Sequence, residues 1–345
     1  MNLAARSLLI ALVGCCLASA QLSAQFARTI DAGGGLFVHQ IGDRAQIREP
    51  GGVSDELVLP KGGTLYRLRH LEGGWIGAGV IEDDRRAGLF LLRSLDGERS
   101  AFVGPPNPSG VELRGDPVPM VQAGQLVGLA WMEGATSRET AVHAARWDGS
   151  GWSEPEVVGR RGPGTQIGLD GVVLADGTWL LAWSGYDGSD DEILWSRRSA
   201  SGWSEPLPLH PGNEAPDIVP SLLETARGAL VAWSESDGRT YRVRLAELNG
   251  ARWRMLPLEV TAGSLRPRLT RGSSISLLYR TVVPPTWTLV ELDERGRATR
   301  RASLPAPTAY RPGLVPADDG PAVFEWPGVR FDEPARREAP WGSPP

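Results

Sequence analysis

The sequence predicts an all-β protein, a six-bladed β-propeller built from four-stranded antiparallel blades. Tryptophans recur about every 50 residues at two positions of a repeat, and these are Trp131, Trp183 and Trp233, then Trp152, Trp203 and Trp253. Within each repeat, short apolar or alternating segments are separated by Gly, Asn and Asp turns, and helical periodicity is missing. Four short strands in about 50 residues is the size of one propeller blade.

The repeat at 216–260 illustrates the strand pattern. Its expected strands are Ile218–Leu223, Ala229–Trp233, Tyr241–Leu245 and Trp253–Val260. The third strand alternates apolar and polar residues with the period of two that is typical of a half-buried strand. Asn249-Gly250, before the fourth strand, is a hairpin signal. The repeat is therefore expected to form one complete blade.

Five complete units follow one another, and a sixth is expected to be shared between the two ends of the chain. The complete units are residues 62–104, 116–158, 165–209, 216–260 and 265–305. Residues 36–60 hold two further strand-like segments, and residues 309–326 hold two more. We expect these halves to pair as the last blade, because a shared blade would close the ring and leave no edge exposed.

The N-terminal 24 residues are expected to direct export rather than to fold. Arg6 precedes an apolar segment of ten residues, which is too short to span a bilayer, and Ala18-Ser19-Ala20 is a cleavage site. Cys15 ends a sequence that resembles a bacterial lipobox, so a lipid anchor there and a free exported protein both remain open. The protein is then periplasmic, anchored to the outer membrane or extracellular. Membrane contact is expected only through Cys15.

The rest of the chain divides into the propeller, residues 26–331, and an irregular tail, residues 332–345. Both cysteines lie in the exported leader, so no disulfide is expected in the fold. A net charge of −5 without a basic run argues against a nucleic-acid partner. The four histidines are scattered without metal-ligand spacing, so neither a metal nor another cofactor is expected.

The repeated tryptophans are expected to pack between blades. Trp287 lies outside the repeat and is the better candidate for stacking on a sugar ring. In a propeller, the loops that join blades share one face with the loops between second and third strands. Those loops carry much of the charge here, so a binding site is expected on that face.

Short segments of the chain resemble motifs of the sialidase superfamily. Ser94–Arg99 resembles the family's Asp-box, also called the BNR repeat, and Ser199–Pro206 is similar but lacks the aspartate. Tyr66-Arg67-Leu68 resembles the motif that opens the family's first blade. The segment at Asn213-Glu214 and the segment at Ala309-Tyr310 are similar to two further motifs.

The resemblance implies roles for individual residues. It implies that Arg67 binds a substrate carboxylate, that Asp83 or Asp84 is the general acid and base, and that Glu214 assists the nucleophile Tyr310. A tyrosine nucleophile suits sialic acid, because the carboxylate on the anomeric carbon would repel an anionic nucleophile.

One departure from the family concerns the arginines that clamp the carboxylate. Ser234 and Glu235 stand where a second arginine is placed, and the third corresponds to Arg266, Arg268 or Arg271, of which Arg266 and Arg268 are the candidates for substrate binding. We therefore expect a propeller that binds a glycan or a cell-envelope partner and hydrolyses ordinary sialosides poorly or not at all. The alternatives are an exo-acting glycosidase of the sialidase type and a scaffold for another protein.

Overall fold

The computed structural model describes residues 28–33, 36–41, 44–48, 54–60, 62–83, 86–105, 113–136, 139–159, 166–186, 189–211, 215–260, 262–272, 274–283, 286–305, 313–316, 322–326 and 329–330. These residues form antiparallel β-sheets, so the all-β prediction is confirmed. The described part of the chain contains no helix that is long and apolar enough to cross a membrane.

The five complete repeat units are confirmed as five blades, which we number 1 to 5 along the chain. Blade 1 contains β5 (Gly63–Leu71), β6 (Gly74–Asp83), β7 (Arg86–Leu95) and β8 (Glu98–Val103). Blade 2 contains β9 (Leu113–Gln122), β10 (Gln125–Gly134), β11 (Thr140–Arg146) and β12 (Glu156–Gly159). Blade 3 contains β13 (Gln166–Val173), β14 (Trp179–Tyr186), β15 (Asp191–Ser199), β16 (Gly202–Trp203) and β17 (Leu207–Pro208), which also pairs with β15.

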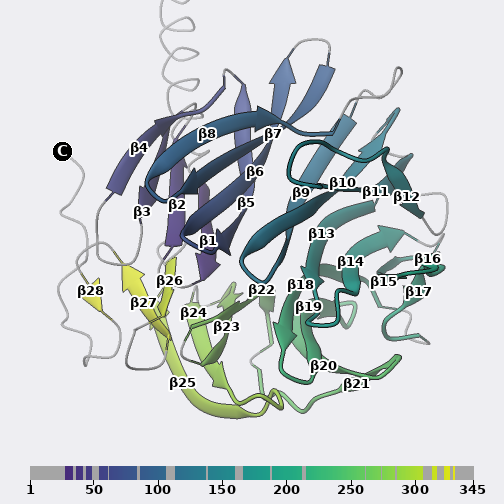
Figure 1. Ribbon diagram of the computed structural model, residues 1–345. Coiled ribbons are helices and arrows are strands. Elements are labelled where there is room, and N and C mark those ends of the chain that lie inside the picture. Colours follow the sequence, from purple (N-terminus) through teal and green to yellow (C-terminus); the bar gives the residue numbers. More distant parts are fainter. Residues whose placement is uncertain are drawn as a thin grey trace, which may run out of the picture.

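The last two blades have four strands each. Blade 4 contains β18 (Asp217–Thr225), β19 (Gly228–Ser236), β20 (Tyr241–Asn249) and β21 (Arg252–Met255). Blade 5 contains β22 (Ser264–Arg271), β23 (Ile275–Thr281), β24 (Thr286–Leu292) and β25 (Ala298–Pro305). The first strands of successive blades pack against one another from β5 to β22, around the centre of the ring in Figure 1.

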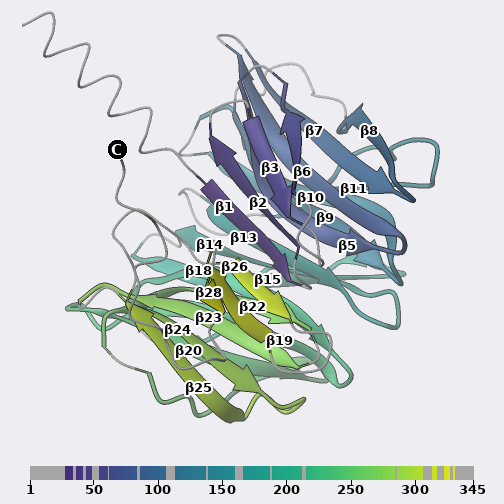
Figure 2. The ribbon, with the colours of Figure 1, turned by 90° about the vertical axis from the view of Figure 1, so that its left-hand side faces the viewer.

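The prediction of a sixth blade shared between the ends of the chain is wrong, and the propeller has five blades rather than six. The N-terminal residues form a complete sheet of β1 (Arg28–Gly33), β2 (Leu36–Ile41), β3 (Arg44–Arg48) and β4 (Ser54–Val58). The C-terminal residues form a separate sheet of β26 (Gly313–Pro316), β27 (Ala322–Trp326) and β28 (Val329–Arg330). Both views place this C-terminal sheet, in yellow, beside blade 5 (Figures 1 and 2).

The reason for the difference is the strand β1, which the sequence analysis did not identify. Thr29 and Ile30 of β1 pair with His39 and Val38 of β2. A pair of glycines, Gly34-Gly35, separates the two strands in the sequence, and such a pair is a two-residue hairpin signal. With its own first strand present, the N-terminal sheet needs no strands from the C-terminus.

The hydrophobic core lies between neighbouring sheets rather than inside any one of them. Trp131, Trp183 and Trp233 are fully buried, and each belongs to a cluster that joins its own blade to the blade before it. The prediction that these tryptophans pack between blades is therefore confirmed. Because these blades each place a large side chain against the blade before, the burial of apolar area stabilises the packing of successive blades around the ring.

Hydrogen bonds near the centre repeat the same connection between blades. Val219 and Arg266 lie at bulges of β18 and β22 with positive φ angles of 56° and 55°. Their N–H groups donate to Ser184 Oγ and Ser234 Oγ of the preceding blades, both at 2.9 Å. The serines that follow Trp183 and Trp233 therefore each accept a hydrogen bond from the next blade.

Candidate functional site

Arg67, expected to bind a substrate carboxylate, lies on β5 and reaches across to blade 3. Its Nη2 donates a hydrogen bond of 2.9 Å to the carbonyl oxygen of Leu169, and its Nε lies 3.9 Å from Asp170 Oδ1. The Arg67 side chain is 11% exposed. The Arg67 guanidinium therefore contacts a carbonyl oxygen and a carboxylate of the protein itself, at the group that was expected to bind a substrate carboxylate.

Asp170 connects three blades through one buried carboxylate, whose side chain is 3% exposed. Arg69 of blade 1 donates to Asp170 Oδ1 from Nη2 at 2.7 Å, and the N–H of Leu222 in blade 4 donates to Oδ2 at 2.9 Å. Burial lowers the pKa of the Arg69 guanidinium, and the Asp170 carboxylate opposes that shift. Blades 1, 3 and 4 therefore share a charged contact, formed by strands at the centre of Figure 1.

The other arginines expected to bind substrate both lie on β22. The Arg266 side chain is exposed, and its N–H is the donor to Ser234. Arg268 is half-buried and pairs with Leu278 across the strands. Ser234, where the resemblance expects an arginine, thus has a structural role between blades 4 and 5.

The catalytic candidates are described only in part. Tyr310, Glu214 and Asp84 lie outside the described residues, and Asp83 is the last residue of β6, described by its backbone alone. The roles that the resemblance assigns to these four residues therefore stay predictions.

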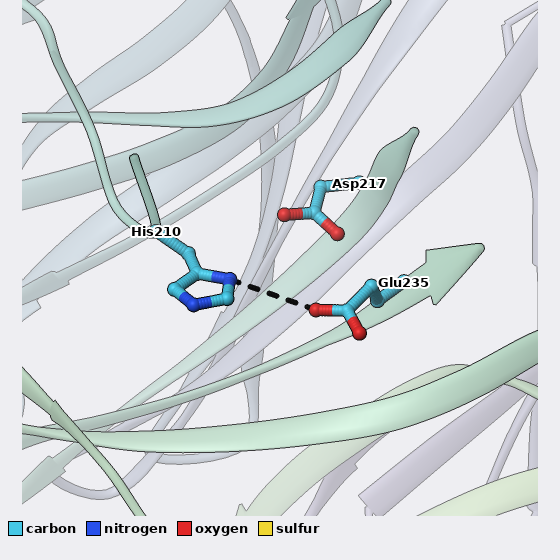
Figure 3. A group of neighbouring side chains, drawn as sticks. All are labelled: His210, Asp217 and Glu235. Atoms are coloured by element: carbon cyan, nitrogen blue, oxygen red, sulfur yellow. Dashed lines mark ion pairs between the residues drawn. The ribbon is translucent and has the colours of Figure 1, made fainter. Parts of the chain in front are cut away.

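The expected face does bring together three side chains that could hold a metal ion (Figure 3). His210 follows β17, Asp217 begins β18 and Glu235 lies near the end of β19, and their donor atoms all lie within 4.8 Å of one another. His210 Nδ1 lies 3.6 Å from Glu235 Oε2. Sequence spacing did not reveal this group, because the connection between blades 3 and 4 and the pairing of β18 with β19 create it.

A surface cavity of about 430 Å³ lies at the opposite ends of the strands, between blades 2 and 3. We call it the tryptophan cavity, and it is lined by Val127, Arg146, Trp147, Asp148, Trp152, Ser153 and Trp179. The rings of Trp147 and Trp152 are inclined at 56° with centroids 4.9 Å apart. A Cβ at Gly128 would lie 2.1 Å from the Trp179 ring, so a glycine is needed there to seat that tryptophan.

Polar groups lie beside these rings. Asp148 Oδ1 accepts hydrogen bonds from the N–H groups of Ser150 and Gly151 and from Ser150 Oγ, at 2.8 to 2.9 Å. These hydrogen bonds lower the pKa of Asp148, and the two from backbone N–H groups have the largest effect. The Asp148 carboxylate is therefore charged at neutral pH. All three use Oδ1, which leaves Oδ2 available to a ligand. Arg146, whose side chain is 59% exposed, adds a donor at the same cavity.

The exposures of two tryptophans differ from the sequence-based expectation. Trp287 is only 3% exposed, so the expectation that it stacks on a sugar is wrong. Trp152 was expected only to pack, yet it lines the cavity while its Nε1 donates to the carbonyl oxygen of Val103 at 3.2 Å. The nearby Trp147 and Asp148 form a cluster in the sequence that could have marked this turn.

Comparison with known proteins supports the fold and shows no family. No protein-family model matches the chain, and no curated protein matches its sequence. Among solved structures, the Aleuria aurantia lectin, a fungal lectin with a six-bladed propeller and a fucose recognition mode, is 14% identical with a TM-score of 0.50. That match covers 82% of this chain and 96% of the lectin.

Two enzymes also share the fold. A Synechocystis apocarotenoid oxygenase is 10% identical with a TM-score of 0.51, over 82% of this chain and 72% of the enzyme. A prolyl endopeptidase is 16% identical with a TM-score of 0.50, over 88% of this chain. This chain spans about half, 48%, of the endopeptidase chain. Identities this low support the β-propeller fold alone.

Proposed function

We propose that this protein is an exported β-propeller that binds a neutral sugar of a glycan in the tryptophan cavity. The observation that carries the proposal is the lining of that cavity, in which three tryptophans lie beside Arg146, Asp148 and Ser153. Binding sites are concave, largely apolar or aromatic, and contain a few polar groups that orient the ligand. The lectin neighbour makes sugar binding a function that this fold supports elsewhere.

The chemistry of a pyranose matches this lining. One face of the ring carries C–H groups, which pack on the electron-rich face of an indole. The rim carries hydroxyl groups, which both donate and accept hydrogen bonds. Asp148 Oδ2 can accept from a hydroxyl, and the Arg146 guanidinium can donate to one. One positive and one negative side chain line the cavity, so a sugar without net charge is the expected ligand.

Replacing Trp152 with alanine is expected to weaken sugar binding by about ten-fold or more. An aromatic contact contributes about 0.5–1.5 kcal/mol beyond the area that it buries, and 1.4 kcal/mol is a factor of ten in affinity. The full chain would be applied to a glycan array that includes fucose, and the strongest ligand would then be titrated by calorimetry.

The control for this experiment is Trp253→Ala. Trp253 occupies the matching repeat position in blade 4 and packs against Trp195 at 5.9 Å, away from the cavity lining. It should bind the sugar as the wild type does. Absence of any glycan signal, or equal affinity in Trp152→Ala and the wild type, would contradict the proposal.

The exported location is part of the proposal and rests on residues 1–24, which lie outside the described residues. Labelling cells with radioactive palmitate distinguishes its two forms. Incorporation that is lost in Cys15→Ala is expected for a lipid-anchored protein, and no incorporation into a protein recovered outside the cytoplasm is expected for a free one. Recovery of the full-length, unlabelled chain in the cytoplasm would contradict export.

A further inference from the structure

We propose that His210, Asp217 and Glu235 bind one zinc ion at the junction of blades 3 and 4. Figure 3 shows the three side chains directed toward a common centre, from the segment after β17 and from the paired strands β18 and β19. The proposal is independent of the sugar site, because the two sites lie at opposite ends of their strands and use different residues.

In blades 2 and 3, a side chain at the corresponding position accepts a hydrogen bond from the repeated tryptophan. In blade 2, Trp131 Nε1 donates to Glu133 Oε2 at 2.7 Å. In blade 3, Trp183 Nε1 donates to Gln166 Oε1, also at 2.7 Å. In both blades the repeated tryptophan therefore uses a nearby side-chain oxygen as its acceptor.

Blade 4 has a carboxylate at each of the two acceptor positions, but neither accepts a hydrogen bond from its repeated tryptophan. Glu235 stands two residues after Trp233, as Glu133 does after Trp131, and Asp217 stands at the register position of Gln166. Yet Trp233 Nε1 is buried and has no hydrogen-bond partner among the described residues. The carboxylates of blade 4 are directed toward His210 instead.

Two donor atoms of the group are also buried without a hydrogen bond. His210 Nδ1 and Glu235 Oε2 have no hydrogen-bond partner in the described part of the chain, although they lie 3.6 Å apart. Buried polar atoms are normally satisfied, so each such atom needs an explanation. A metal ion bound between them would satisfy both.

The charges also favour a cation. Glu235 lies directly opposite Asp217 in the pairing of β18 and β19, whereas Glu133 in blade 2 lies opposite Arg114. Two carboxylates directly opposite each other repel, and Asp217 is fully buried. Arg244 Nε donates to Glu235 Oε1 at 2.8 Å, which supplies one positive charge and orients the carboxylate. A divalent cation would stabilise both carboxylates.

The donor set and the spacing favour zinc over calcium and magnesium. Zinc binds imidazole nitrogen and carboxylate oxygen at about 2.0–2.2 Å in tetrahedral geometry, which places two donors about 3.4 Å apart. The observed separation of 3.6 Å between His210 and Glu235 fits that value. Calcium and magnesium prefer oxygen ligands alone, so the imidazole disfavours them. Three protein ligands leave the fourth position open to water or to a ligand oxygen.

The test is a calorimetric titration of the full chain, stripped of metal with a chelator, with zinc chloride alone. One equivalent of zinc is expected to bind and to raise the melting temperature. Because loss of an outer-shell partner already weakens metal binding by about 10–100-fold, loss of a direct ligand should weaken it by about 100-fold or more. That weakening is expected in both His210→Ala and Glu235→Gln.

The matched control is His143→Ala in blade 2. His143 Nδ1 lies 3.4 Å from Glu133 Oε1. This similar pair belongs to no metal-binding group of three among the described residues, so the variant should bind zinc as the wild type does. Circular dichroism would verify that each variant is folded. The proposal is overturned if the wild type binds no stoichiometric zinc, if His210→Ala binds it unchanged, or if His143→Ala loses it equally.

Discussion

Replacing Asp170 with asparagine is expected to lower the free energy of unfolding by about 3 kcal/mol or more. The substitution removes the negative charge that Arg69 contacts at 2.7 Å and Arg67 approaches to 3.9 Å. Breaking a buried ion pair by removing one partner costs about 3–5 kcal/mol, because the other charge stays buried without compensation. Asparagine keeps one oxygen for the N–H of Leu222, so the expected cost is at the lower end.

Chemical denaturation followed by tryptophan fluorescence would measure this loss. Glu294→Gln is the control, because it removes the 2.7 Å pair with Arg271 on the surface, where the two side chains are 49% and 39% exposed. Exposed pairs contribute about 0–1 kcal/mol, so this variant should unfold nearly as the wild type does. Equal losses in the two variants would mean that Asp170 does not connect the blades energetically.

Replacing Trp183 with alanine is expected to have a similarly large effect, about 3–5 kcal/mol. Trp183 is fully buried in the cluster that joins blades 2 and 3, and truncating a buried aromatic side chain leaves a cavity that the surrounding residues only partly fill. The substitution also removes the indole Nε1, which donates a hydrogen bond of 2.7 Å to Gln166 Oε1. Denaturant unfolding should therefore show a markedly lower midpoint.

A comparison of two phenylalanine variants separates the hydrogen bond from the packing. Trp183→Phe loses both packing volume and the bond to Gln166, whereas Trp233→Phe loses volume alone because its Nε1 makes no hydrogen bond to a described residue. A buried hydrogen bond contributes about 1 kcal/mol, so Trp183→Phe should be the more destabilised by about that amount. A larger loss in Trp233→Phe would contradict this assignment.

The positions expected to bind a substrate carboxylate show what local motifs cannot predict. Arg67 was expected to face a substrate, and the structure shows it bonded to Leu169 beside Asp170. Those partners lie about 100 residues away in the chain, and no local motif indicates that they meet. In the sequence, Ser234 stands where the resemblance expects an arginine. In the structure, its hydroxyl oxygen accepts a hydrogen bond from the N–H of Arg266 in the next blade.

The repeat, the five complete blades and the burial of Trp131, Trp183 and Trp233 could all be predicted from the sequence. Strand alternation, turn residues and repeated tryptophans are local signals, and each blade is built from neighbouring segments of chain, so local signals suffice. The way in which the two ends of the chain form separate sheets follows from tertiary contacts that the sequence pattern does not reveal. The same is true of the burial of Trp287, of the three tryptophans that line one cavity, and of the approach of His210 to Asp217 and Glu235. These outcomes depend on which strand ends and loops are brought together when blades pack, and side chains distant in sequence converge there without a local pattern.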